Sequence, residues 1–278
     1  MINSTQLDGI ALVVGAGRGI GREAAFSLAE AGAKVVVFAD MDDTTATTSS
    51  EESKEHATNK DYKTAIFKMD ARDEKSVQDM VDFVVGQFGR LDYAVNAAGV
   101  GSGVQVPLVE TDIANFDRIM NFNVRANFVC VRAQVAAMRK QEPKTWNSRN
   151  GTRDIGRGAI VNLASAHSFA GLPGKASYTI SKHAFVGVTK MAALDHASEG
   201  VRVNAVCPSW VRTPMLDAEN RDNPRVQGAI SAIVPIQRAA EVEEVSDTIA
   251  FLCSPAASYI NGASLLIDSA VTATVRLF

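Results

Sequence analysis

"VVGAGRGIGREAA", residues 13–25, joins a short apolar run to the start of a helical pattern. Its glycines Gly15, Gly19 and Gly21 let the backbone turn tightly and come close to a bound group. The N-terminus of the helix that begins here presents free N–H groups and the positive end of the helix dipole, which favour phosphates. The stretch therefore predicts a strand, a turn and a helix that bind a dinucleotide; a purely structural turn is the alternative.

Apolar, β-branched runs alternate with longer helical patterns along the chain. The runs that predict strands are IALVV (10–14), KVVVF (34–38), TAIFK (64–68), LDYAVN (91–96), GAIVNLA (158–164), VRVNAV (201–206) and SLLID (264–268). Helical patterns cover about 19–31, 43–58, 74–88, 112–140, 175–198 and 241–253. This alternation predicts an α/β fold: a single-domain, Rossmann-type, doubly wound parallel sheet of about seven strands, buried on both faces by helices.

Length and charge set the class of protein. With 278 residues, 46% hydrophobic, the chain fits one domain spanning 1–278, because no Pro/Gly/Ser-rich linker divides it in two. Its 28 basic and 31 acidic residues give a net charge of -3, which provides no attraction to nucleic acid or to an anionic membrane. The N-terminal segment lacks a basic region, and its apolar run is far shorter than the roughly 20 residues of a membrane span, so a cytoplasmic protein is expected.

The three cysteines, Cys130, Cys207 and Cys253, are far apart in the sequence and odd in number. This spacing favours buried free thiols in a reducing compartment over a disulfide framework. It also lacks the close pairing of a zinc site, so no metal is expected.

An acidic residue follows the second predicted strand: Asp40, in "VVVFADMDD" (35–43). A carboxylate here accepts hydrogen bonds from ribose hydroxyls and repels a 2′-phosphate, which favours NAD over NADP. Three alternatives stand beside this interpretation. Asp40 is an ordinary strand-end or capping residue, Ala39 occupies the selecting position, or the basic Arg18 in the glycine turn favours NADP instead.

"ASYTISKHAF" (176–185) places Tyr178 and Lys182 four positions apart on one face of a predicted helix. A free phenol has a pKa of about 10 and is a poor base near neutrality. A positive charge nearby favours the phenolate, so we expect Lys182 to lower the pKa of Tyr178 and to let it exchange a proton with a substrate oxygen. A surface helix with an extended lysine is the alternative.

These motifs together resemble the short-chain dehydrogenase/reductase family from Gly15 to about residue 268. The spacing Gly15-x3-Gly19-x-Gly21 is similar to that family's TGxxxGxG, with Val14 in place of Thr and the loss of one side-chain hydrogen bond. "NAAG" (96–99) is similar to its NNAG. Ser165 ends a predicted strand 13 positions before the tyrosine, which is the family's spacing.

The resemblance implies a catalytic tetrad of Asn123, Ser165, Tyr178 and Lys182, in which Asn123 holds a water joined to the lysine; Asn121 is the competing choice for that position. A hydroxyl at a strand end, such as that of Ser165, stabilises charge on the substrate oxygen. The cofactor contacts that it implies are Gly15, Arg18, Gly19, Ile20, Gly21, Asp40, Asp70, Ala71, Asn96, Ala97, Gly99, Tyr178, Lys182, Pro208, Val211 and Thr213. For Asp70 and for residues 96–99, plain turn chemistry is the alternative.

Specific functions within this set also follow from the resemblance. Asp70 and the next backbone amide, that of Ala71, hold the adenine ring, and Thr213 in "CPSWVRTPM" (207–215) bonds the nicotinamide carboxamide. In "YINGASLLIDSAV" (259–271), Ser269 and Ala270 replace two glycines of the family, so the family's backbone conformation is not expected there.

Two regions depart from the common pattern. The insertion "KQEPKTWNSRNGTRDIGRG" (140–158) is polar, rich in turn residues and similar to insertions in fungal secondary-metabolism reductases. The resemblance implies that residues of about 209–240 form a lid over the substrate. Its apolar side chains either form a wall over a carbon-rich substrate or pack in the core or between subunits: Ile230, Ile233, Val234, Pro235 and Ile236.

The residues after Ser165, namely His167, Phe169 and Leu172, are candidates for the pocket lining. For His167 a solvated loop position is the preferred interpretation.

The predicted function is hydride transfer between NAD, alternatively NADP, and a secondary alcohol or ketone of a small, carbon-rich metabolite. The alternatives are a nucleotide-binding sensor or scaffold without turnover, and a reductase that also guides a cyclisation or isomerisation. By resemblance the protein is a homo-oligomer, a tetramer or dimer, formed through the central helix and the helix of Tyr178.

Overall fold

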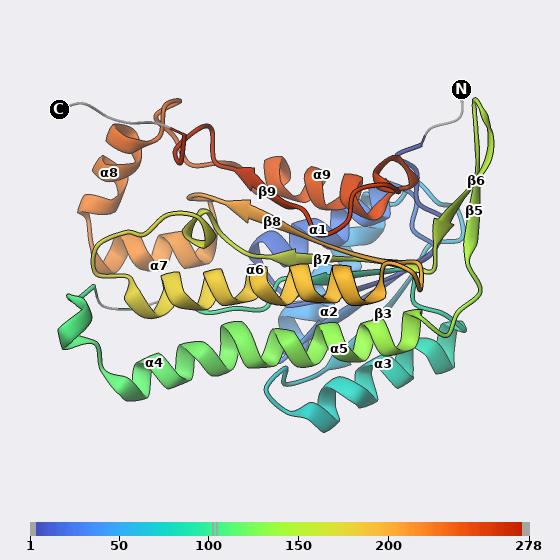
Figure 1. Ribbon diagram of the computed structural model, residues 1–278, viewed down its shortest axis with the longest axis horizontal. Helices are drawn as coiled ribbons and strands as arrows, with labels where there is room; N and C mark the ends of the chain where they lie inside the picture. The colour runs from blue at the N-terminus through green and yellow to red at the C-terminus, as the bar shows by residue number, and fades with distance from the viewer. Residues whose placement is uncertain (1–3, 102, 104, 274–278) are drawn as a thin grey trace.

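A parallel sheet of seven strands forms the centre of the structure, a computed structural model that describes residues 4–101, 103 and 105–273 (Figure 1). The strand order is β3-β2-β1-β4-β7-β8-β9. The strands are β1 (Ile10–Val14), β2 (Val35–Asp40), β3 (Lys63–Lys68), β4 (Tyr93–Asn96), β7 (Gly158–Leu163), β8 (Val201–Pro208) and β9 (Ser264–Ile267). Because the order reverses between β1 and β4, a ligand crevice is expected outside their carboxyl ends.

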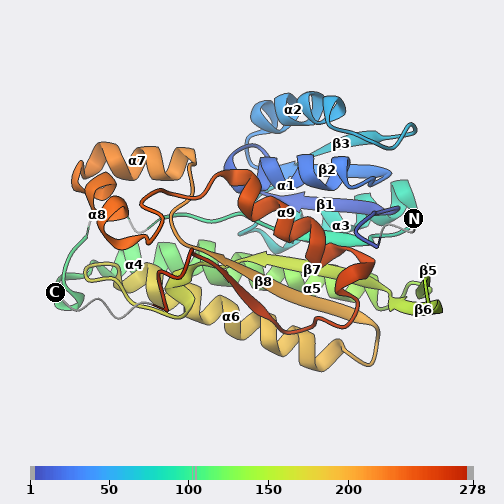
Figure 2. The ribbon, with the colours of Figure 1, turned by 90° about the horizontal axis from the view of Figure 1, so that it is seen from above.

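Helices cover both faces of this sheet (Figures 1 and 2). They are α1 (Gly19–Glu30), α2 (Asp43–Glu52), α3 (Glu74–Phe88), α4 (Ile113–Met120), α5 (Asn127–Met138), α6 (Ala176–His196), α7 (Pro214–Asp222), α8 (Arg225–Ile233) and α9 (Val242–Cys253). Leu12 and Val14 of β1 belong to the apolar cluster shared with α3, α5 and α6, and Val13 to the one shared with α1 and α9. Burial of alternate residues on opposite faces explains why these strands are continuous apolar runs.

All seven predicted strands are present, and the α/β prediction is confirmed. The expectation of burial on both faces is wrong for β3 and β9, which lie at the two edges of the sheet. β3 exposes Lys63, Ile66 and Lys68, and β9 exposes Leu266. The predicted helix at 112–140 is divided into α4, a π-helical turn at Asn121–Ala126, and α5. α7 and α8, within the predicted lid, were not predicted as helices.

The insertion at 140–158 contains an antiparallel hairpin that the sequence analysis did not predict, β5 (Lys144–Ser148) with β6 (Gly151–Gly156). The hairpin precedes the first residue of β7, so it lies at the amino ends of the parallel strands. Figures 1 and 2 show it at the opposite end of the molecule from α7 and α8. The insertion is therefore remote from the crevice at the carboxyl ends.

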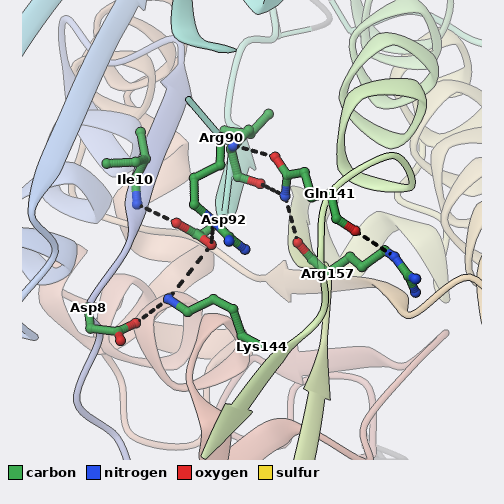
Figure 3. Close-up of polar contacts among 8 residues, drawn as sticks. Asp8, Ile10, Arg90, Asp92, Gln141, Lys144 and Arg157 are labelled. Atoms are coloured by element: carbon green, nitrogen blue, oxygen red, sulfur yellow. Dashed lines mark hydrogen bonds and ion pairs between the residues drawn. The ribbon is translucent and has the colours of Figure 1, made fainter. Parts of the chain in front are cut away.

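A polar network anchors the hairpin to the base of the sheet (Figure 3). The buried carboxylate of Asp92 accepts hydrogen bonds from the Ile10 backbone N–H at 2.8 Å and from Arg90 Nε at 2.6 Å. Lys144, the first residue of β5, pairs with Asp8 and lies 3.8 Å from Asp92. A buried carboxylate requires such partners, so the network fixes the start of β1, β4 and the hairpin together.

Gln141 adds a second anchor beside this network. Its side chain accepts from the backbone N–H of Leu91 at 2.6 Å and donates to the carbonyls of Leu91 and Arg157. Arg157 Nε in turn donates to the Gln141 carbonyl at 2.7 Å. Polar residues of the insertion thus satisfy backbone groups at the end of the sheet.

The backbone after β9 departs from expectation. Ser269 and Ala270 have positive φ values of 48° and 64°, in the region that favours glycine, although neither is glycine. The carboxylate of Asp268 accepts hydrogen bonds from the N–H groups of Ala270 and Thr272 and from the Thr272 hydroxyl. These bonds offset the conformational cost of the left-handed turn.

The cysteines Cys130, Cys207 and Cys253 are buried and unpaired, as their spacing predicted. Among residues 4–101, 103 and 105–273, no group of three or more His, Cys, Asp or Glu side chains is placed to hold a metal ion. Within the same ranges, no helix has both the length and the apolar character needed to cross a bilayer.

Candidate active site

The glycine turn joins β1 to α1 and is closely packed. Gly15 and Gly19 have positive φ values of 84° and 57°, which glycine adopts without strain. A Cβ on Gly21 would lie 2.0 Å from the carbonyl oxygen of Gly15, and one on Gly15 would lie 2.7 Å from the Ala98 nitrogen. Glycines are therefore required here by close backbone approach as well as by conformation.

The N-terminus of α1 has the properties of an anion site. Arg18, exposed at the N-cap, makes no side-chain cap, and the first turn, which includes Ile20, carries no acidic residue. A Cβ placed on Gly19 would have Thr213 Cγ2 as its nearest neighbour, at 3.6 Å. The turn thus lies beside the segment after β8, from which a nicotinamide contact is expected.

The end of β2 presents Asp40 to the same turn. Its Oδ2 accepts a hydrogen bond from the Gly17 N–H at 2.9 Å, and Oδ1 accepts one from the Asp42 N–H at 3.1 Å. Ala39 is completely buried in the core. Asp40 and Ala39 were the two candidates for the position that distinguishes NAD from NADP. Of the two, only Asp40 has a side chain that reaches the glycine turn.

Asp70, after β3, is paired with Arg72. Arg72 Nε and Nη2 lie within 3.1 Å of its carboxylate oxygens, and this hydrogen bonding lowers the pKa of Asp70. The carboxylate is thus ionised, and both of its oxygens already accept hydrogen bonds from Arg72. Ala71 lies between them, and its side chain is buried.

Asn96, at the end of β4, does not direct its side chain into the crevice. The side chain is fully buried, and its Nδ2 donates to Gln134 on α5 and to Asn162 on β7, each at 2.9 Å. Asn162 donates to the hydroxyl of Thr189 on α6. This interior amide chain was not predicted, and it leaves only the backbone of Asn96, with Ala97 and Gly99, for the cofactor side.

Asn123 lies in the π-helical turn between α4 and α5 and is fully buried. Its Oδ1 accepts from the Val100 N–H at 2.9 Å, and its Nδ2 donates to the Val100 carbonyl at 3.0 Å and to the Ser181 hydroxyl at 3.1 Å. A Cβ on Gly99 would lie 3.3 Å from Asn123 Oδ1 and 3.9 Å from Lys182 Nζ. Asn123 therefore joins the loop after β4 to the helix of Tyr178.

Ser165, Tyr178 and Lys182 meet at the carboxyl end of β7. The Ser165 hydroxyl lies close enough to the Tyr178 hydroxyl to lower its pKa. It accepts from the His167 N–H at 3.2 Å and donates at 3.4 Å to the carbonyl of Pro208, the last residue of β8. Lys182 Nζ lies 5.6 Å from the centre of the Tyr178 ring and donates to the Leu163 carbonyl at 2.9 Å. The four residues of the predicted tetrad thus lie close together at the carboxyl end of β7.

The pKa of Tyr178 does not follow the expectation. Burial raises it to about 12, against a smaller lowering by the Ser165 hydrogen bond, and the charge of Glu219 raises it further. Burial also lowers the pKa of Lys182 to about 8. The lysine was expected to lower the phenol pKa, but in this structure exclusion of water is the largest cause of the shift, and Lys182 is not among its causes. The phenol is therefore protonated at neutral pH.

His167 is also different from expectation. Its Nδ1 lies 3.0 Å from the Thr179 hydroxyl, and its ring packs edge-on against Tyr178 with centroids 5.3 Å apart. Burial lowers its pKa to about 4, and Lys175 lowers it further. The solvated loop position was thus the wrong interpretation, and His167 is a neutral, positioned neighbour of the tyrosine.

The other two candidates for the pocket lining, Phe169 and Leu172, lie in different surroundings. Phe169 is about half exposed. Leu172 lines an open, mostly apolar groove with neighbours that include Pro107, Leu108 and Ile180. The groove includes Thr179, the partner of His167, but Ser165, Tyr178 and Lys182 do not line it.

The lid candidates are mainly packed against one another. Ile230 and Val234 are buried with Leu216, Val226 and Ala239, whereas Ile236 is exposed. Interior packing therefore accounts for Ile230 and Val234. At the base of the lid, Val211 is buried, and Thr213 caps α7 by accepting from the Leu216 N–H at 3.3 Å.

Comparisons with known proteins agree with this geometry. A family model described as Enoyl-(Acyl carrier protein) reductase matches residues 15–272. The chain is 38% identical over 271 residues to "Short-chain dehydrogenase anuF" of Penicillium roqueforti, covering 98% of each protein. It is 35% identical to a 2,5-dichloro-2,5-cyclohexadiene-1,4-diol dehydrogenase of Sphingobium indicum, covering 94% of this chain and 96% of that one.

Among solved structures, that of levodione reductase matches with a TM-score of 0.85 and 30% identity, covering 97% of this chain and all of that one. The chain therefore belongs to the short-chain dehydrogenase/reductase family, whose members transfer hydride between a nicotinamide cofactor and an alcohol or ketone.

Proposed function

We propose that the chain interconverts a ketone and a secondary alcohol of a small, carbon-rich metabolite, with Tyr178 as the proton-transferring group. The observation that carries the proposal is the placement of the Ser165 and Tyr178 hydroxyls together, beside the Lys182 ammonium, at the carboxyl end of the sheet. Two converging hydroxyls suit one oxygen atom of a substrate. The apolar groove beyond Thr179 supports a carbon-rich substrate.

The glycine turn fits a dinucleotide cofactor. It combines backbone positions that exclude a Cβ with a helix N-terminus free of acidic first-turn residues. Asp40 at the end of β2 would hold the adenosine ribose, and Thr213 lies near enough to Gly19 to contact the same bound molecule. When bound, the cofactor supplies or accepts the hydride.

The protein's own contribution is proton transfer and placement. In reduction, the protonated phenol of Tyr178 donates to the substrate oxygen as charge develops there, and the Ser165 hydroxyl stabilises that charge. Lys182 places a cationic group behind the phenol. Asn123 is a positioning residue, because its amide holds Val100 and Ser181 beside the lysine. In oxidation the proton moves in the opposite direction.

The activity is tested by mixing the purified chain with NADH or NADPH and a panel of apolar ketones, then with the oxidised cofactors and alcohols. We expect nicotinamide absorbance to change in both directions. Tight cofactor binding with no turnover across the panel would instead support the sensor alternative. Mass and chiral analysis of the products would reveal an added cyclisation or isomerisation.

We expect Asp40→Ala to relax the preference for NAD by about tenfold, because the variant no longer repels a 2′-phosphate. The measurement is kcat/KM with each cofactor. Asp40→Asn separates two effects, since it keeps an acceptor for the Gly17 N–H but removes the charge. Asp43→Ala removes a nearby exposed charge and is the matched control. Unchanged selectivity in both Asp40 variants would show that another group selects the cofactor.

We propose a homo-oligomer formed through α5 and α6. Exposed apolar side chains support this: Phe128 on α5, and Ile180, Met191 and Leu194 on α6, the last of which is 73% exposed. Large exposed apolar side chains on adjacent helices are typical of an interface between copies. Three buried, unpaired cysteines support the further proposal of a reducing, cytoplasmic location.

A further inference from the structure

Helices α7 and α8, with the short segment after them, form a unit with its own interior. We call residues 214–233 the lid helices. Leu216, Val226 and Ile230 pack together with Val234 and Ala239, apart from the two clusters that flank the sheet. Figures 1 and 2 show the two helices beyond the carboxyl ends of the strands. A unit with a separate core is able to move as one body.

Both ends of this unit are fixed at one place. Val211 and Ala240 form an isolated parallel bridge, in which the Arg212 N–H donates to the Ala240 carbonyl and the Ala240 N–H donates to the Trp210 carbonyl, each at 2.9 Å. Arg212 and Glu241 add an exposed ion pair at 3.0 Å. Because both ends of the segment meet at this bridge, the lid helices are connected to the rest of the domain at one place.

A partly buried ion pair joins the lid to the helix of the tyrosine. Lys175 Nζ lies 2.7 Å from Glu219 Oε1, across 44 residues of sequence. Lys175 is the N-cap residue of α6, three positions before Tyr178, and only 7% of its surface is exposed. Glu219 lies on α7. A largely buried lysine requires a partner, so opening of the lid would leave its charge uncompensated.

The pair also lies near the reacting groups. The charges of Lys175 and Glu219 act on His167, and that of Glu219 acts on Tyr178. His167 in turn packs against the tyrosine ring. In this position, α7 therefore lies close to the site where the substrate oxygen is expected.

We propose that Lys175 and Glu219 are positioning residues that hold α7 closed over the substrate side of Tyr178. The pair sets how tightly the substrate is retained, and neither residue takes part in proton or hydride transfer. The claim about substrate rests on the proposed function; the claim about closure does not.

The closure claim is tested by proteolysis, which needs no activity. Arg221 and Arg225 are exposed at the junction of α7 and α8, and trypsin cleaves after them when the lid helices loosen. We expect Glu219→Gln and Lys175→Met each to speed cleavage there by about tenfold or more. The control is Asp217→Asn, which removes an exposed charge from the same helix. Unchanged cleavage in both variants would contradict the proposal that the ion pair holds α7 closed, whether or not the protein is an oxidoreductase.

The positioning claim is tested by steady-state kinetics. We expect Glu219→Gln to raise the ketone KM by about tenfold, with kcat and the cofactor Kd within about threefold of the parent. The double variant Lys175→Met/Glu219→Gln leaves no orphaned charge, so it should be less impaired than Lys175→Met alone. Simple additivity of the two single effects, or a loss confined to kcat, would contradict the proposal.

Discussion

Tyr178→Phe is expected to lower turnover by about a thousandfold, because general acid–base catalysis of this kind contributes roughly 10² to 10⁴. The phenol pKa of about 12 means that the wild-type group carries its proton at neutral pH, ready for a ketone oxygen. Phenylalanine fills the same space and keeps the edge-on contact with His167. The cofactor Kd should therefore stay within about threefold, a change of well under 1 kcal/mol.

Single-turnover rates and a nicotinamide fluorescence titration measure the two quantities separately. Tyr62→Phe is a matched control, since Tyr62 also has a partly buried hydroxyl, bonded to Ser53, with its pKa raised by burial to about 12. That variant should keep full turnover. Substantial activity in Tyr178→Phe would remove the tyrosine from proton transfer and leave Ser165 as the remaining hydroxyl at this point.

Much of the fold follows from the sequence because the inner strands of the parallel sheet are buried on both faces. β1, with every residue buried, can be recognised from five consecutive apolar letters. The hairpin has no such signal: β5 contains Lys144, Trp146 and Ser148 in a mostly polar run, exposed on one side. Its pairing depends on contacts with Asp8 and Asp92, which lie far away in sequence.

The candidate site divides in the same way. Fixed spacings within one element, such as Tyr178 to Lys182, predict neighbours correctly. Properties that depend on the exclusion of water by other elements do not follow from spacing. The raised pKa of the phenol, the burial of His167 and the inward turn of Asn96 all come from packing by α5, α6 and the lid. The Lys175 and Glu219 pair likewise joins segments that no motif connects.

Gly21→Ala is expected to weaken cofactor binding by about 100-fold and to lower the free energy of unfolding by about 2 kcal/mol, within the range typical of overpacking. Gly21 lies within α1 and has no positive φ, so alanine meets no conformational penalty there. The expected loss comes from contact alone: the new Cβ would lie 2.0 Å from the Gly15 carbonyl and 3.1 Å from the Ala97 Cβ. Either α1 moves away from β4 or the turn deforms, and both changes disturb the helix N-terminus that we propose binds the phosphates.

Gly86→Ala separates this close approach from the general effect of adding a methyl group to a helix. Gly86 is exposed in α3 with no atom within 4 Å of a built Cβ, so alanine there should raise the free energy of unfolding by about 0.5–1 kcal/mol and leave cofactor affinity unchanged. Denaturant unfolding should show opposite changes in stability for the two variants, and fluorescence titration should show a loss of cofactor affinity in Gly21→Ala alone if the turn binds the cofactor. If Gly21→Ala lost stability but kept its cofactor affinity, the close contact would be structural only, and the phosphates would have to bind elsewhere along the carboxyl ends of the strands.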